Sequence, residues 1–155
     1  MILVNYKNYQ ETWGDKAVEI AKICEKVAKE TKVPIYPVVS ALDGHRIMKE
    51  TGIKTILQAV GERWEGASSG QVSALAAEKI GISGSLLNHS EMKMKPGTIK
   101  KLLAVWPGNF WSIVCIHSIG QAEGWAKNIR PSYVAYEPTY LIGNKDKSVA
   151  SEKAQ

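Results

Sequence analysis

Six short runs of apolar and β-branched residues recur along the chain, and each has the length and composition of a β-strand. Between most of them lie longer segments in which apolar positions are three or four residues apart, as on one face of an amphipathic helix. The predicted strands are Ile2–Tyr6, Val33–Ser40, Thr55–Val60, Ser83–Asn88, Trp111–Ile116 and Tyr133–Glu137.

Four predicted helices lie between these strands, and ordinary start and stop signals mark several of their ends. Pro96 suits the first turn of a helix, Gly81 suits the position after a C-terminus, and Pro131 suits a stop. The helices begin near Ala17, Val72, Pro96 and either Ser118 or Gly120, and they end before Lys32, at Ile80, at Leu103 and at Ile129.

The alternation of strands and helices predicts an α/β fold with parallel strands joined by crossover helices. A doubly wound sheet and an eight-stranded barrel both satisfy this pattern, but no G-x-G-x-x-G turn follows the first strand, which disfavours nucleotide binding. A complete (β/α)8 barrel needs about 200 residues or more. This chain has 155 and follows its sixth strand with a polar segment, Asn144–Gln155. We therefore expect a single partial barrel domain over 1–155, either truncated or naturally open with six strands.

The composition, 45% hydrophobic and 23% charged, is that of a globular protein. The net charge of +5 comes from scattered lysines, which we interpret as solvated helix faces that suit anionic ligands. No stacking or groove-reading motif indicates a nucleic-acid partner. No apolar run approaches the roughly 18 residues of a membrane helix, and the N-terminus opens directly on strand residues. We expect no membrane partner, no signal peptide and a cytoplasmic location.

The two cysteines, Cys24 and Cys115, are far apart in the sequence and form no metal or redox motif, so both are predicted to be small buried hydrophobic residues. No pair of histidines has the spacing of zinc ligands, and we predict no metal site. His45 and His117 are interpreted as surface or structural residues. No G-x-S-x-G motif predicts a serine nucleophile.

Polar residues follow three of the predicted strands. Alternate residues of a strand share a face, so Asn5 and Lys7 point the same way, at the carboxyl end of the first strand. His89 ends the fourth strand, and Glu137 ends the sixth, where a proline and a loop closed by Gly143 follow. Taken alone, each of Lys7, His89 and Glu137 is also explained by an ordinary structural role. Because the carboxyl ends of barrel strands carry the chemistry, together they predict an active site.

Several motifs, in this order, resemble the triosephosphate isomerase family, and specifically its shorter archaeal form, over essentially the whole chain. The family's N-x-K, G-A-x-T-G and G-x-L-x-N-H-S-E sequences, its catalytic strand and its lid are similar to Val4–Lys7, Gly66–Gly70, Gly84–Glu91, Ala135–Pro138 and Leu141–Gly143. The resemblance implies a TIM barrel in which strands seven and eight are missing.

The resemblance also implies an activity, the interconversion of dihydroxyacetone phosphate and glyceraldehyde 3-phosphate through an enediolate. Glu137 would be the base that shuttles the proton, His89 would polarise the carbonyl as a neutral imidazole, and Lys7 would hold the anionic substrate and offset charge on its oxygen. These roles of the glutamate and the histidine are the established ones of the family. The implied substrate contacts also include Asn5, Tyr6, Ile142 and Gly143, and Glu91 would support the site from behind. No cofactor is implied, and the family forms homodimers or homotetramers.

Some positions depart from the family. Met92–Lys93 stand where the family has two arginines, and Ser69 stands where it has a threonine that reaches the neighbouring subunit. The strands whose loops supply most phosphate contacts are not present, so we expect residues 1–155 alone to show little turnover. The alternative reading is a catalytically dead remnant of a barrel that serves as a binding or structural module.

Overall fold

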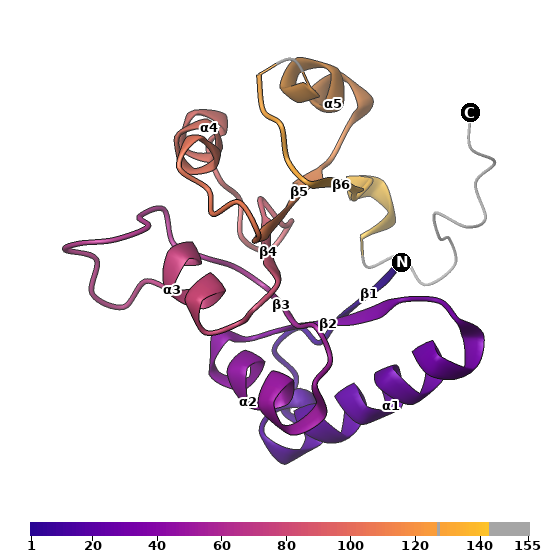
Figure 1. The fold of residues 1–155 in the computed structure, drawn as a ribbon. Coiled ribbons are helices and arrows are strands. Elements are labelled where there is room, and N and C mark those ends of the chain that lie inside the picture. The colour runs from indigo at the N-terminus through magenta and orange to yellow at the C-terminus, as the bar shows by residue number, and fades with distance from the viewer. Residues whose placement is uncertain (127, 143–155) are drawn as a thin grey trace.

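The computed structural model describes residues 1–126 and 128–142, and these form one sheet of six parallel strands with α-helices between them (Figure 1). The strands are β1 (Ile2–Asn5), β2 (Ile35–Val39), β3 (Ile56–Leu57), β4 (Gly84–Leu87), β5 (Trp111–Ile116) and β6 (Tyr133–Tyr136). The helices are α1 (Asp15–Thr31), α2 (Ala41–Thr51), α3 (Ala74–Lys79), α4 (Pro96–Ala104) and α5 (Ile119–Ala126), with 3₁₀ turns η1 (Gln10–Thr12) and η2 (Thr139–Leu141).

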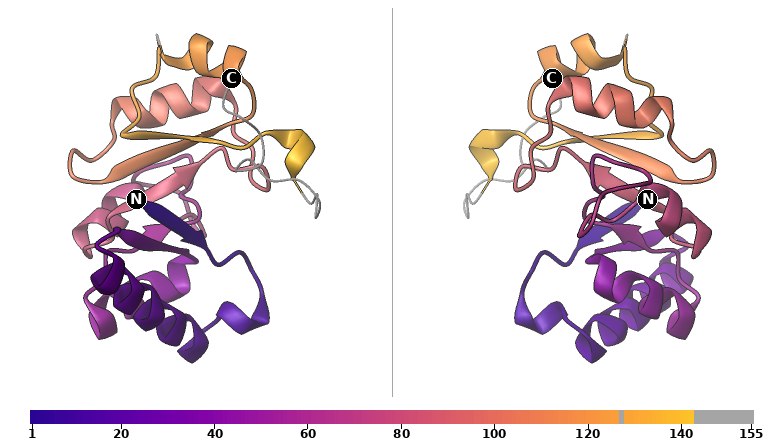
Figure 2. Two further views of the ribbon diagram at one scale, coloured as in Figure 1. Left: turned by 90° about the vertical axis from the view of Figure 1, so that its right-hand side faces the viewer. Right: turned by 90° about the vertical axis from the view of Figure 1, so that its left-hand side faces the viewer.

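The strands lie side by side in sequence order, and every neighbouring pair is parallel. The sheet curls, and the helices lie along its outer side (Figures 1 and 2). The predicted α/β alternation with crossover helices is therefore confirmed, and the architecture is that of an incomplete barrel. In the part of the chain that the structure describes, β1 and β6 each pair with one strand only.

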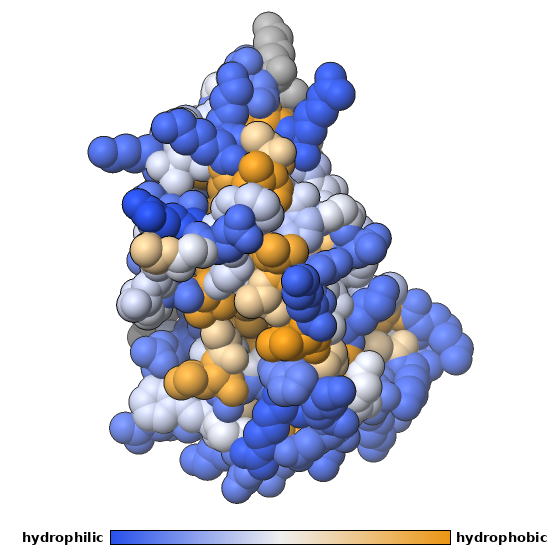
Figure 3. Space-filling view, turned by 60° about the vertical axis from the view of Figure 1, so that its left-hand side comes forward, coloured by the Kyte–Doolittle hydropathy of each residue, from blue (hydrophilic) through white to orange (hydrophobic). Residues whose placement is uncertain are grey.

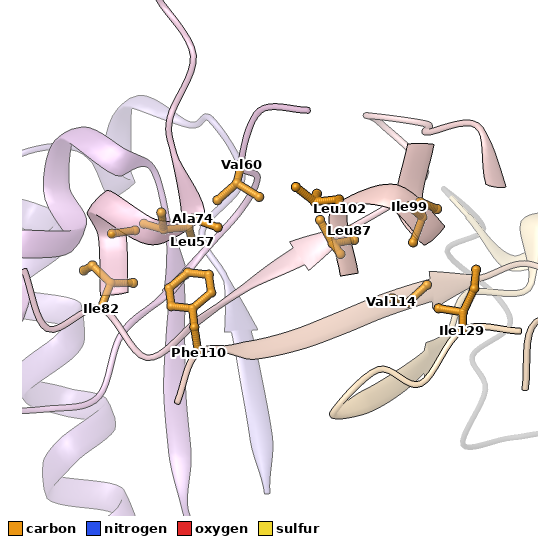
Figure 4. Close-up of a cluster of buried hydrophobic side chains, with 11 residues drawn as sticks. Leu57, Val60, Ala74, Ile82, Leu87, Ile99, Leu102, Phe110, Val114 and Ile129 are labelled. Carbon is orange, nitrogen blue, oxygen red and sulfur yellow. The ribbon is translucent and has the colours of Figure 1, made fainter. Parts of the chain in front are cut away.

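Two apolar layers cover the outer face of the sheet, and a third fills its concave face. One outer layer packs α1 and α2 against β1 and β2 around Ile47 and Val39. The other packs α3, α4 and the segment after α5 against β3, β4 and β5 around Phe110 (Figure 4). The inner layer consists of Val38, Ile56, Leu86, Ile113 and Cys115. On the face shown in Figure 3, apolar side chains lie between borders of hydrophilic ones.

The first residue of β4, Gly84, has no room for a side chain. A Cβ atom built on Gly84 would lie 2.5 Å from the backbone oxygen of Trp111, the residue paired with it on β5. Glycine is therefore needed there for close packing of two backbones. Gly97, in the first turn of α4, has open space around the same position.

Helix α2 was not predicted from the sequence. Its exposed Leu42 interrupts the apolar stripe, and only Gly44 and Ile47 are buried. The signals that define it are its ends, because the Ser40 hydroxyl accepts a hydrogen bond from the Asp43 amide and Gly52 adopts a left-handed conformation with φ of 75°. The other helices occur where predicted, although the helix after β5 is shorter than expected.

Most strands are shorter than their apolar runs. Only Ile56–Leu57 of the predicted run Thr55–Val60 forms the ladder of β3, because the chain turns away after Gln58, whose side chain contacts the end of β1. None of the helices within the described ranges is long and apolar enough to cross a bilayer.

Candidate active site

Four polar residues of the predicted site lie together at the carboxyl edge of the curled sheet. Asn5 ends β1 and Lys7 lies two residues further, His89 lies two residues after β4, and Glu137 follows β6. Parallel strands bring these ends to one edge even though β1 and β6 are not paired with each other. They surround an open hollow of about 290 Å³, lined by Leu3, Asn5, Lys7, Val38, Leu86, His89, Cys115, Ala135 and Glu137.

The imidazole of His89 is the centre of the site. Its Nε2 atom lies 3.0 Å from Oε1 of Glu137 and 3.2 Å from Nζ of Lys7. The side-chain amide nitrogen of Asn5 lies 3.5 Å from the same Nε2 atom. A cation, a carboxylate and an imidazole are thus in direct contact at one point of the hollow.

The contacts of His89 also favour one tautomer. The backbone N–H of Glu91 donates to Nδ1 at 3.3 Å, so Nδ1 accepts. Nε2 lies nearest to an acceptor, Oε1 of Glu137 at 3.0 Å, and it donates to this carboxylate when the ring proton is on Nε2. Two donor-only groups, Nζ of Lys7 and Nδ2 of Asn5, lie farther from the same atom, at 3.2 and 3.5 Å, and Nζ has its own acceptor in Oε1 of Glu91 at 3.0 Å. The ammonium group of Lys7 adjoins the ring. The imidazole therefore presents an N–H donor to the hollow.

The carboxylate of Glu137 is held by the turn that carries His89. The Ser90 amide donates to Oε2 at 3.1 Å, and the Ser90 hydroxyl lies 3.4 Å from Oε1. The Glu137 amide donates to Ile116 O at 2.8 Å. Its side chain is 21% exposed, so the carboxylate is shielded and still open to the hollow.

The backbone of Lys7 is in the left-handed region, with φ of 54°, a conformation that costs a non-glycine residue roughly 1–2 kcal/mol. Two neighbours hold it there. The Lys7 amide donates to Oδ1 of Asn5 at 3.0 Å, and Nε2 of Gln58 donates to the Lys7 carbonyl at 2.6 Å and to Asn5 Oδ1 at 3.3 Å. Gln58 was not predicted as a site residue, and the available signal was a polar residue within the third apolar run.

Glu91 lies behind the reacting groups. Its Oε1 pairs with Nζ of Lys7 at 3.0 Å, and its Oε2 lies 3.6 Å from Nδ1 of His89. The side chain is 65% exposed, so this carboxylate orients the lysine from the solvent side.

Cys115 is buried, as predicted, and it also lines the hollow. Burial raises the pKa of its thiol to about 12, and the adjacent Glu137 carboxylate acts in the same direction. The thiol is therefore neutral at physiological pH and gives the carboxylate a neutral neighbour. Cys24, a residue of α1, is also buried, as predicted.

Other predicted site residues lie elsewhere. Tyr6 is 4% exposed and packs in the layer between β1 and α1, because the alternation that turns Asn5 inward turns Tyr6 outward. The structure thus corrects the expected substrate contact of Tyr6. Ile142 is 53% exposed and does not line the hollow, and Gly143 is outside the described residues. The two histidines that were interpreted as surface or structural residues lie outside this group. His45 is exposed on α2, and half-buried His117 contacts the backbone of Glu137.

The chemistry available at this edge is proton transfer. A carboxylate can act as a base, a ring N–H can donate to a developing oxyanion, and a lysine can supply positive charge for an anionic ligand. No group of three histidine, cysteine or acidic side chains with the arrangement of a metal site occurs in the described ranges. The chain is thus of the α/β-barrel class, and its strand ends bring together groups that can transfer a proton.

A sequence model of the triosephosphate isomerase family matches residues 1–155, and the chain belongs to that family. The triosephosphate isomerases of Methanothermus fervidus and Methanocaldococcus jannaschii are 34% and 33% identical to it over 93% and 92% of this chain. That of Sulfurisphaera tokodaii is 33% identical over 100% of the chain. The matched regions make up 65%, 65% and 67% of those relatives, so the chain spans about two thirds of their length.

The fold has a solved counterpart. The crystal structure of triosephosphate isomerase from Bartonella henselae matches with a TM-score of 0.67 at 18% sequence identity, covering 88% of this chain and 67% of that one. At this level of identity the likeness concerns the fold, and it agrees with six strands of a barrel.

Proposed function

We propose that this protein is an aldose–ketose isomerase that interconverts dihydroxyacetone phosphate and glyceraldehyde 3-phosphate. The observation that carries the proposal is the contact of His89 Nε2 with both Glu137 Oε1 and Lys7 Nζ at the mouth of one hollow. Membership of the triosephosphate isomerase family supports the choice of substrate.

In the proposed reaction, Glu137 and His89 each transfer a proton twice, once in each direction. Glu137 removes a proton from the carbon beside the carbonyl, and the electrons of that C–H bond form the double bond of an enediolate. The carbonyl oxygen receives a hydrogen bond, and then a proton, from Nε2–H of His89, while Lys7 offsets the negative charge. Glu137 returns its proton to the neighbouring carbon, and the second hydroxyl gives its proton back to His89.

The contacts that hold Glu137 imply a first step before chemistry. Glu137 is engaged by Ser90 and His89, so a bound substrate has to take the place of these contacts. The substrate oxygen then occupies the position near His89 Nε2 that the Glu137 carboxylate holds in this structure. The segment from Pro138 through Ile142 to Gly143 is proposed to close over the substrate and exclude water.

The proposal extends to assembly and location. A homodimer or homotetramer in the cytoplasm is expected from family membership. The exposed Trp64, in the segment between β3 and α3 that contains Ser69, is a candidate contact. Light scattering at micromolar concentration tests the assembly, and a monodisperse monomer would contradict it.

The function is tested by following glyceraldehyde 3-phosphate in deuterated buffer by proton NMR. The wild-type chain should form dihydroxyacetone phosphate and exchange the carbon-bound proton faster than buffer, although more slowly than the Methanothermus fervidus relative. Glu137→Gln should remove most of the rate that exceeds that of buffer, because general acid–base catalysis contributes about 100-fold or more. Glu123→Gln, an exposed site on α5, is the matched control and should leave the rate unchanged. A wild-type rate equal to that of buffer, or equal rates for wild type and Glu137→Gln, would refute the proposal.

A further inference from the structure

The backbone of Glu137 is held at both of its polar groups from the end of β5. Its amide donates to the Ile116 carbonyl at 2.8 Å. Its carbonyl oxygen lies 3.3 Å from Nδ1 of His117. The register of β5 and β6 ends at Ile116 and Tyr136, so the imidazole adds one further link beyond the regular ladder.

This link occurs at the hinge of the site. Glu137 is the last residue before Pro138, which has no N–H group, and the chain then enters η2. A strand that is about to leave its sheet has few ways to fix its final carbonyl. The side chain of half-buried His117 provides one, while the backbone amide of His117 donates to Oε1 of Gln121 in α5 at 2.8 Å.

The proton of the His117 ring is placed by Asn88. This asparagine is 3% exposed, and two backbone contacts orient its amide: Oδ1 accepts from the Met94 amide at 2.9 Å, and Nδ2 donates to the Cys115 carbonyl at 2.9 Å. The same Nδ2 lies 3.5 Å from Nε2 of His117. Nδ2 can only donate, and the Glu137 carbonyl beside Nδ1 can only accept, so both contacts are satisfied when Nε2 accepts and the ring proton is on Nδ1.

We infer that His117 is a positioning residue, which fixes the backbone of Glu137 by donating from Nδ1–H to its carbonyl. Asn88, His117 and Glu137 follow β4, β5 and β6, so these contacts join three successive strand ends. The carboxylate of a base has to be placed within a fraction of an ångström of the proton it removes. The catalytic part of this inference rests on the proposed function; the structural part does not.

The structural part is tested first by nitrogen-15 NMR of the histidine rings in the full chain. In the neutral ring of His117, the proton should lie on Nδ1. A ring protonated on Nε2 instead would overturn the inference, because it has no proton for the Glu137 carbonyl. This measurement needs no catalysis, so its outcome is separate from that of the proposed function.

The second test compares His117→Phe with His45→Phe, the same substitution at an exposed position on α2. His117→Phe should speed hydrogen exchange at the Glu137 amide by about tenfold and lower kcat by about tenfold, with KM changed less than about twofold, because only the placement of the base is altered. His117→Gln retains a donor and should recover part of both effects. Unchanged exchange at Glu137 in His117→Phe, or a loss in His117→Gln as large as in His117→Phe, would overturn the inference.

Discussion

Oε1 of Glu137 lies 3.0 Å from Nε2 of His89, although the two residues are 48 positions apart in sequence (137 − 89). The contact joins the ends of β4 and β6, with β5 between them. The predicted base, Glu137, and the predicted donor, His89, therefore contact each other directly. A ligand that binds at His89 Nε2 would have to separate them. The order of the strands alone brings them together.

Gln58 is predicted to stabilise the left-handed backbone of Lys7. Gln58→Met keeps the size of the side chain and removes both donors, which leaves the Lys7 carbonyl and Asn5 Oδ1 without this partner. We expect the free energy of unfolding to fall by about 1–3 kcal/mol, the cost of unsatisfied polar groups. Urea unfolding measures it. Gln10→Met, at an exposed position, is the control, and equal stabilities for the two variants would contradict the prediction.

Gly84→Ala should disrupt the contact of β4 with β5. The added Cβ would lie 2.5 Å from a backbone oxygen, which cannot be relieved by rotating a side chain, so we expect a loss of about 1–3 kcal/mol or more. Gly97→Ala places the same methyl group in open space on a helix and should raise stability by about 0.5–1 kcal/mol. Thermal unfolding measures these opposite changes in stability. An unchanged stability of Gly84→Ala would contradict the prediction, because it would show that β4 and β5 move apart without a loss of free energy.

Stability should fall at alkaline pH. Burial raises the pKa of Tyr6, Cys24 and Cys115 above their ordinary values. Near and above about pH 9 the unfolded chain loses these protons while the folded chain keeps them, so the unfolded state binds fewer protons and the free energy of unfolding decreases. Below about pH 8 these groups are protonated in most molecules of both states, so they add little to the pH dependence of the free energy of unfolding.

Tyr6→Phe tests one part of this alkaline loss. The Tyr6 hydroxyl is buried beside the Cys24 thiol without a hydrogen bond of good geometry, so its removal should cost little at pH 7. The variant should lose less stability than wild type between about pH 9 and 11, measured by urea unfolding at each pH. Parallel curves for the two proteins over that range would contradict the prediction.

Particular residues show how much of this molecule the sequence predicts. The strand alternation that turns Asn5 and Lys7 to one face also turns Tyr6 into the outer layer, so its burial follows from the same rule that predicts the site. Helix α2 was missed because its signals are the caps Ser40 and Gly52, while its apolar stripe is short.

The supporting residues were harder to predict. Gln58, Ser90 and His117 act through single hydrogen bonds to a backbone or a carboxylate of another strand end. Such contacts have no periodicity and no motif spacing, because they depend on which strand ends become neighbours. The residues at the centre of the site are recognised from their position at strand ends, while those that hold them are found only in three dimensions.

Lys7, His89 and Glu137 are proposed to meet around one small phosphorylated ligand. This proposal is tested most directly by NMR of the chain, with labels at the Lys7 Nζ, the His89 ring nitrogens and the Glu137 carboxyl carbon, during titration with 2-phosphoglycolate, whose planar carboxylate resembles an enediolate. All three signals should shift together along one binding curve, and inorganic sulfate at the same concentration should shift them less. Shifts confined to other surface residues, or a response of Lys7 without His89 and Glu137, would contradict it.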